Sequence, residues 1–125
     1  MKNSLAVAML AAIVAAPAAL WAHHGMYGYD REHLTTVKGT VTEFDLVNPH
    51  TLIHLVIKEK NGEVEAWTAE AAPPNMLRRV GWDKTTIRPG DRITVTGYRA
   101  KDGARLLSVR SIVLPNGQQL NQRPY

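Results

Sequence analysis

Apolar and polar side chains alternate between residues 50 and 58, where the chain reads HTLIHLVIK. In an extended chain one face carries Thr51, Ile53, Leu55 and Ile57, and the other carries His50, Leu52, His54 and Val56. A period of two is typical of a strand with one face in a core. Residues 50–58 are therefore predicted to form a strand.

Three more segments have the composition of strands. Residues 36–46 are rich in Val, Thr and Phe, and Gly39 within them predicts a bend. A strand is expected at 91–98, after the turn Arg88-Pro89-Gly90-Asp91, with Ile93 and Val95 facing inward. A further strand is expected from about 105 to 114, and the polar tail 115–125 is expected to be loose.

Asn61-Gly62 is a strong signal for a two-residue hairpin turn. A turn centred there makes Lys58 face Glu65 and Val56 face Trp67 across two antiparallel strands. In this register Glu70 faces Ile53, on the opposite side of the sheet from His54. A shift of one residue would reverse that relation.

One helix is predicted, from Pro73 or Pro74 to Val80, with Gly81 ending it. Its apolar stripe consists of Met76, Leu77 and Val80. Five strands with a helix between the third and fourth is the order of an OB-type barrel. The predicted fold is therefore all-β, a small five-stranded OB-like barrel with one short helix between strands 3 and 4.

The first 22 residues have the pattern of an export signal. Lys2 is followed by an uninterrupted apolar run at 5–16, Pro17 ends that run, and Leu20-Trp21-Ala22 offers a small residue at the cleavage site. A cut after Ala18 and a retained membrane anchor are the alternatives, although the apolar run is shorter than the roughly 20 residues that span a bilayer.

Cleavage after Ala22 divides the chain into a signal peptide (1–22), an N-terminal segment (23–35), the barrel domain (36–114) and the tail (115–125). The exported protein is expected in a bacterial periplasm, with no membrane span after cleavage. It keeps 14 of the 15 Lys and Arg residues and all 11 acidic residues, which leaves a net charge of +3. No basic stripe with interleaved aromatic residues is present, so nucleic acid is not an expected partner.

The cleaved chain would begin His23-His24-Gly25. The α-amine and imidazole of a terminal histidine can chelate a transition metal, and such nitrogen ligands favour copper, with zinc or nickel as alternatives. A further ligand is needed, either His24 through its ring and the intervening amide, or His50 folding over from the barrel. The opposing interpretation is a loose N-terminus whose histidines have no function.

His50 and His54 lie about 13 Å apart along one strand, too far to share an ion directly. His50 at the rim is therefore the better candidate ligand, and His54 is expected to be structural. Glu70 is a candidate rim residue, with an ion pair to Arg78 or Arg79 as the favoured alternative.

The aromatic residues have two interpretations. Trp67 and Trp82 are expected in core or rim packing, and secondarily on a ligand surface. Met26, Tyr27 and Tyr29 either seal the N-terminal segment against the barrel or are partly buried in an amphipathic linker.

No catalytic residues are predicted. The chain has no cysteine, no serine in a nucleophile-elbow setting and no glycine-rich phosphate loop, which makes an enzyme the least expected class. Two functions stay open: a periplasmic metal-binding protein, or a metal-free barrel that binds a protein, a peptide or a small apolar ligand.

The order of short motifs along the chain resembles a family of small exported bacterial proteins known only as a domain of unknown function. The motifs are His23-His24-Gly25, Asn48-Pro49-His50, Trp67-Thr68-Ala69-Glu70, Gly81-Trp82 and Pro89-Gly90-Asp91. The resemblance covers nearly the whole chain and implies a periplasmic OB-like barrel. It implies no activity and transfers no site residues.

Overall fold

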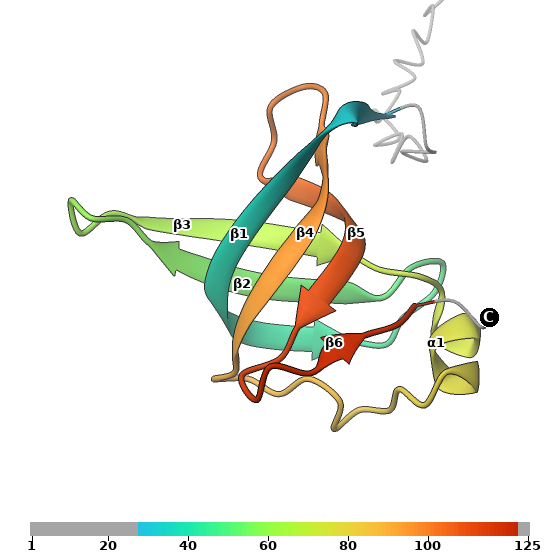
Figure 1. The fold of residues 1–125 in the computed structure, drawn as a ribbon. Helices are drawn as coiled ribbons and strands as arrows, with labels where there is room; N and C mark the ends of the chain where they lie inside the picture. The colour runs from blue at the N-terminus through green and yellow to red at the C-terminus, as the bar shows by residue number, and fades with distance from the viewer. Residues whose placement is uncertain (1–27, 123–125) are drawn as a thin grey trace, which may run out of the picture.

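Five long strands close into a barrel in the computed structural model, which describes residues 28–122 (Figure 1). The elements are β1 (Tyr29–Asp45), β2 (Leu52–Lys58), β3 (Val64–Glu70), α1 (Pro74–Arg79), β4 (Arg92–Ala100), β5 (Leu106–Val113) and β6 (Gln119–Leu120). The predicted helix therefore lies where it was expected, between the third and fourth strands.

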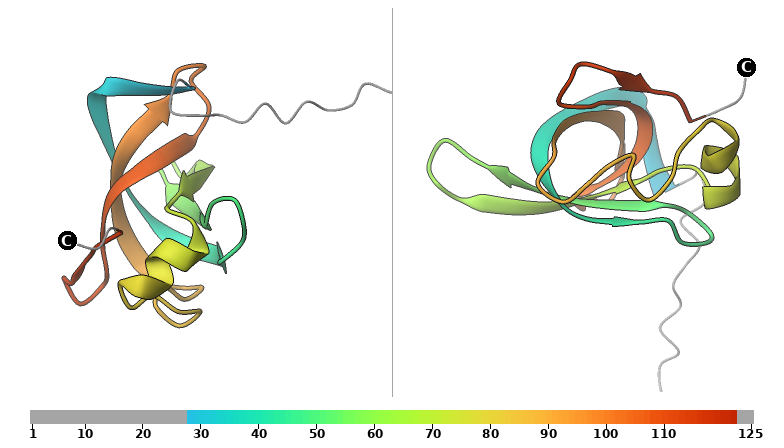
Figure 2. Two further views of the ribbon diagram at one scale, coloured as in Figure 1. Left: turned by 90° about the vertical axis from the view of Figure 1, so that its right-hand side faces the viewer. Right: turned by 90° about the horizontal axis from the view of Figure 1, so that it is seen from below.

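The strands are hydrogen-bonded in the order β3-β2-β1-β4-β5-β6, and a parallel pairing of β3 with β5 closes the ring. Seen from below, the strands form a ring with α1 beside it, and the β2–β3 hairpin extends away from it (Figure 2). This arrangement confirms the predicted all-β, OB-like barrel.

The interior of the barrel is filled by the inward faces of its strands. Ile53 and Leu55 from β2 are fully buried, and so are Ile93 and Val95 from β4. The alternation at 50–58 and the inward positions on β4 are thus confirmed. β2 itself begins at Leu52, so His50 lies in the loop before it.

The predicted register of the β2–β3 hairpin is wrong by one residue. Lys58 pairs with Val64, and Leu55, not Val56, pairs with Trp67. The loop holds three residues, because the amide of Glu59 donates to the carbonyl of Glu63 and Gly62 closes the turn at φ 87°. A type I turn followed by a left-handed glycine adds one residue to the loop, which reverses the face of every side chain on β3.

The two ends of the barrel chain also differ from expectation. β1 begins at Tyr29, seven residues before the predicted start at Thr36. Part of the tail is ordered, because Gln119 and Leu120 pair with the end of β5 and Leu120 is buried. The prediction of a loose tail is therefore wrong for these residues. The segment has one buried apolar residue, Leu120, and a single apolar residue produces no periodic pattern in the sequence.

Helix α1 ends as predicted. Gly81 has φ 92°, its amide donates to the carbonyl of Arg78, and the amide of Trp82 donates to the carbonyl of Leu77. This pair of bonds is a Schellman motif, which satisfies the last carbonyls of the helix and needs a left-handed residue.

Replacing Gly81 with valine is expected to lower the free energy of unfolding by roughly 1 kcal/mol or more, because a β-branched residue resists positive φ. A Cβ at Gly81 meets no atom within 4 Å, so the effect isolates backbone strain. Urea unfolding of the variant measures it. An unchanged unfolding free energy would contradict the role of Gly81 as the helix stop.

Candidate site at His50, Glu70 and Tyr29

His50 lies in the loop between β1 and β2, directly after a cis peptide bond at Asn48–Pro49. Its side chain is 44% exposed, and its Nδ1 contacts Oε1 of Glu70. An ionised carboxylate only accepts hydrogen bonds, so the contact is made by a protonated Nδ1. In a neutral imidazole this leaves the lone pair on Nε2 as the free ligand atom.

Glu70, the last residue of β3, is 18% exposed in its side chain. It pairs across the sheet with Leu52, which puts it on the face that also carries His54. The predicted position opposite Ile53 is therefore wrong, for the same one-residue reason as the hairpin. The expected ion pair to Arg78 or Arg79 is replaced by His50.

Tyr29 is the third member of the group. Its hydroxyl donates to the second carboxylate oxygen, Oε2 of Glu70, at 2.7 Å, and the residue is only 5% exposed. Burial, the hydrogen bond and the negative charge of Glu70 all raise the pKa of the Tyr29 phenol well above its ordinary value of 10.0. One carboxylate thus joins the start of β1, the end of β3 and the β1–β2 loop.

The sequence predicts a role at the rim for two of these three residues. For Tyr29 it predicts only packing, because nothing in the spacing of residues 41 positions apart predicts its bond to Glu70. The candidate ligands His23 and His24 lie outside the described residues.

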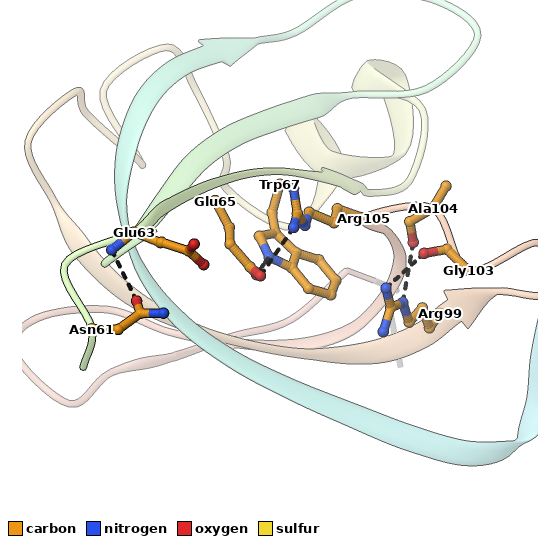
Figure 3. Close-up of polar contacts among 8 residues, drawn as sticks. All are labelled: Asn61, Glu63, Glu65, Trp67, Arg99, Gly103, Ala104 and Arg105. Carbon is orange, nitrogen blue, oxygen red and sulfur yellow. Dashed lines mark hydrogen bonds and ion pairs between the residues drawn. The ribbon is translucent and has the colours of Figure 1, made fainter. Parts of the chain in front are cut away.

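Trp67 on β3 is buried, and its indole lies among the side chains of Glu65, Arg99 and Arg105 (Figure 3). Its indole Nε1 donates to Glu65 at 2.9 Å, and the Arg99 guanidinium carbon lies 5.0 Å from the ring centroid. Glu65 also pairs with Arg105 at 3.1 Å, and Arg99 donates to the carbonyls of Gly103 and Ala104. Trp67 is therefore buried with the Arg99 guanidinium over its ring, and it does not offer an exposed ring for stacking.

Trp82 follows helix α1 and is 3% exposed. Its Nε1 donates to the carbonyl of Asn121 at 2.8 Å, and its ring lies 6.3 Å from that of Phe44. It therefore packs in the core and joins the C-terminal residues to the barrel, and its ring does not form part of an exposed ligand surface.

A model of a family of unknown function, DUF6152, matches residues 10–107. The chain belongs to this family. The resemblance drawn from the motifs is thereby confirmed at the level of an uncharacterised family. No curated protein matches the chain.

Among solved structures, the chain is similar to Rim1, a mitochondrial single-stranded DNA binding protein from S. cerevisiae. The TM-score is 0.52 at 13% identity, over 66% of this chain and 92% of that one. A small single-stranded DNA-binding protein from Streptomyces coelicolor is similar with a TM-score of 0.45 at 11% identity, over 69% of this chain and 94% of that one. At these identities the likeness to Rim1 supports the fold alone.

None of the described helices has the length and hydrophobicity needed to cross a membrane.

Proposed function

We propose that this is a small periplasmic metal-binding protein in which the mature N-terminal His23 binds a transition metal, with copper favoured and zinc or nickel as alternatives. His50 is the barrel's own ligand, and His24 is the alternative third ligand. The observation that carries the proposal is the contact between Glu70 and Nδ1 of His50.

Metal-binding histidines usually donate their second ring N–H to a carboxylate or carbonyl, which fixes the tautomer and makes the other nitrogen a better ligand. Glu70 is placed to do this for His50. Glu70 is itself held by the Tyr29 hydroxyl, so the carboxylate has a defined orientation. A histidine with only a structural role, bonded to a loop carbonyl, would need neither the carboxylate of Glu70 nor the hydrogen bond from Tyr29 that orients it.

The chain is long enough to bring the N-terminal ligands to this group. Tyr29 is bonded to Glu70, and four residues separate it from His24. The five steps along the chain from Tyr29 to His24 span at most about 18 Å when extended. This length of chain supports the proposal that the α-amine of His23 and the imidazole of His50 bind one ion.

Copper is favoured by the donor set. An α-amine and two imidazoles offer three nitrogen atoms and no thiolate, and Cu²⁺ binds such ligands more tightly than nickel or zinc does. A periplasmic location follows from the predicted signal at 1–22 and rests on that prediction alone.

The face formed by β1, β2 and β3 argues against nucleic acid as the ligand. OB folds bind oligonucleotides on the strand 2–3 face, where cations and exposed aromatic rings are needed. In this chain that face carries the carboxylates of Glu43, Asp45 and Glu70. The burial of Trp67 and Trp82 likewise weakens the alternative of a metal-free barrel that uses these rings to bind a protein, a peptide or an apolar ligand.

The mature protein beginning at His23 is expected to bind Cu²⁺ at least tenfold more tightly than the same protein with an acetylated N-terminus. Acetylation converts the α-amine into an amide and removes one nitrogen donor. Binding should weaken as pH falls, because imidazole and amine must lose protons to coordinate, and a free α-amine has a pKa of about 7.7–8.0. Titration against a competing chelator measures the affinity, and the intact mass of the exported protein fixes the cleavage site.

Two substitutions test the contribution of the barrel. His50→Ala and Glu70→Gln are each expected to weaken Cu²⁺ binding about 10-fold or more, in the range typical of ligands and their hydrogen-bond partners. His33→Ala is the matched control, since His33 is an exposed histidine paired with Asp30. Loss of affinity only in His24→Ala would indicate a purely N-terminal site, and equal affinity for native and acetylated proteins would exclude the proposal.

A further inference from the structure

A β-bulge in β1 places three potential metal ligands on the outer face of the sheet. Val41 pairs with Leu55, but the next pair is Glu43 with His54, so Thr42 is an extra residue. Without it, Glu43 would face inward like Val41. The bulge reverses the alternation, so that Phe44 turns toward the core and Glu43 and Asp45 share a face with His54.

The three ligand atoms lie within 4.8 Å of one another. Nε2 of His54 is 3.6 Å from Oδ2 of Asp45, close to the roughly 3.4 Å that separates two ligands on a tetrahedral zinc ion. Nδ1 of His54 is 3.2 Å from the hydroxyl of Thr68 on β3, outside this group. Thr68 thus orients the imidazole with Nε2 toward the carboxylates, as a ligand's partner usually does.

The charges of this group are not balanced by the protein. Across the residues that the structure describes, the ion pairs of lysine and arginine include neither Glu43 nor Asp45. Two adjacent carboxylates repel each other, and a divalent ion bound by all three side chains would relieve that repulsion.

We infer that Glu43, Asp45 and His54 form a second metal site, the outer-face site, which takes a divalent transition-metal ion of the zinc type. Two carboxylate oxygens and one imidazole nitrogen are common ligands of Zn²⁺, with a water molecule as the fourth. The side chains are partly exposed, so the ion would exchange readily with solvent. The outer-face site shares no residue with the proposed copper site.

Zinc binding tests the site with Zn²⁺ alone as the probe. The mature chain carrying His23→Ala, His24→Ala and His50→Ala lacks the imidazole ligands of the proposed copper site, and it is still expected to bind one Zn²⁺ by calorimetry. In that background Asp45→Asn, Glu43→Gln and His54→Gln are each expected to weaken Zn²⁺ binding at least tenfold. Zinc should also shift the imidazole NMR signals of His54 rather than those of His33.

Glu63→Gln is the matched control, because Glu63 is an exposed acid in the β2–β3 hairpin. It should leave the affinity unchanged. Zinc affinity that stays within twofold in the Asp45→Asn and His54→Gln variants would overturn the inference, as would zinc shifts confined to other histidines. Neither result depends on whether His23, His24 and His50 bind copper, since all three are replaced in the background protein.

Discussion

Replacing Gly97 with alanine is expected to lower the free energy of unfolding by about 3 kcal/mol, at the upper end of the range for overpacked interiors. Gly97 is buried in β4, and a Cβ there would lie 2.3 Å from the carbonyl oxygen of Ser108. The obstacle is backbone and not a flexible side chain, so β4 and β5 would have to separate. Urea unfolding followed by circular dichroism measures the change.

The position of Ser108 makes this contact important for the whole barrel. Ser108 pairs with Tyr98 on β4 and with Glu70 on β3, so β5 is held between two strands at this point. Displacing β5 therefore weakens the β3–β5 pairing that closes the ring. It also moves Glu70, so the variant should lose order at the His50–Glu70–Tyr29 group along with stability.

Gly117→Ala provides the comparison for Gly97→Ala. Gly117 has φ 86°, and a Cβ there meets nothing within 4 Å, so its replacement measures only the cost of positive φ, about 1 kcal/mol. If Gly97→Ala proved no more destabilising than Gly117→Ala, the close approach of β4 and β5 would not be a determinant of the fold.

Most of the fold is predictable from local patterns in the sequence, because the strands and the helix end are determined by the conformational preferences of neighbouring residues. The alternation at 51–57 needs only the geometry of a strand, and the end of α1 needs only a glycine that tolerates positive φ. The predicted register of the hairpin is wrong because the Asn61-Gly62 pair fits both a two-residue and a three-residue loop. Only the pairing of the whole strands, with Trp67 inside the barrel, selects between them.

The candidate site was predictable only in part, because its contacts are long-range. His50 and Glu70 have the right chemistry for a site near the rim, but the face of Glu70 depends on the hairpin register. The sequence does not predict the start of β1, because residues 30–33 are polar and charged and show no alternation of polar and apolar side chains. The outer-face site depends on a bulge at Thr42. A bulge arises from the pairing of two strands, and the sequence around Thr42 does not show which residues it will pair with.

Tyr29→Phe is expected to change how stability depends on alkaline pH. The raised pKa of the buried Tyr29 keeps its phenol protonated in the folded protein, whereas in the unfolded chain it ionises near its ordinary value of 10.0. The folded state thus holds one more proton above pH 10, and stability present below pH 10 is lost as pH rises. This loss amounts to about 1.4 kcal/mol per pH unit, and it is absent in the phenylalanine variant.

The measurement is the difference in unfolding free energy between wild type and Tyr29→Phe, taken by urea denaturation from pH 8 to pH 11.5. Residues that titrate equally in both proteins cancel in this difference, which should shrink by about 2 kcal/mol over the upper part of the range. The Glu70→Gln variant separates the effect of burial on the pKa of Tyr29 from the effect of the Glu70 carboxylate. Because burial is the largest single cause of the raised pKa of Tyr29, a reduced slope should persist in that variant. A difference between wild type and Tyr29→Phe that is constant with pH would show that the Tyr29 hydroxyl is not held in the barrel, and would remove one of the contacts on which the proposed copper site rests.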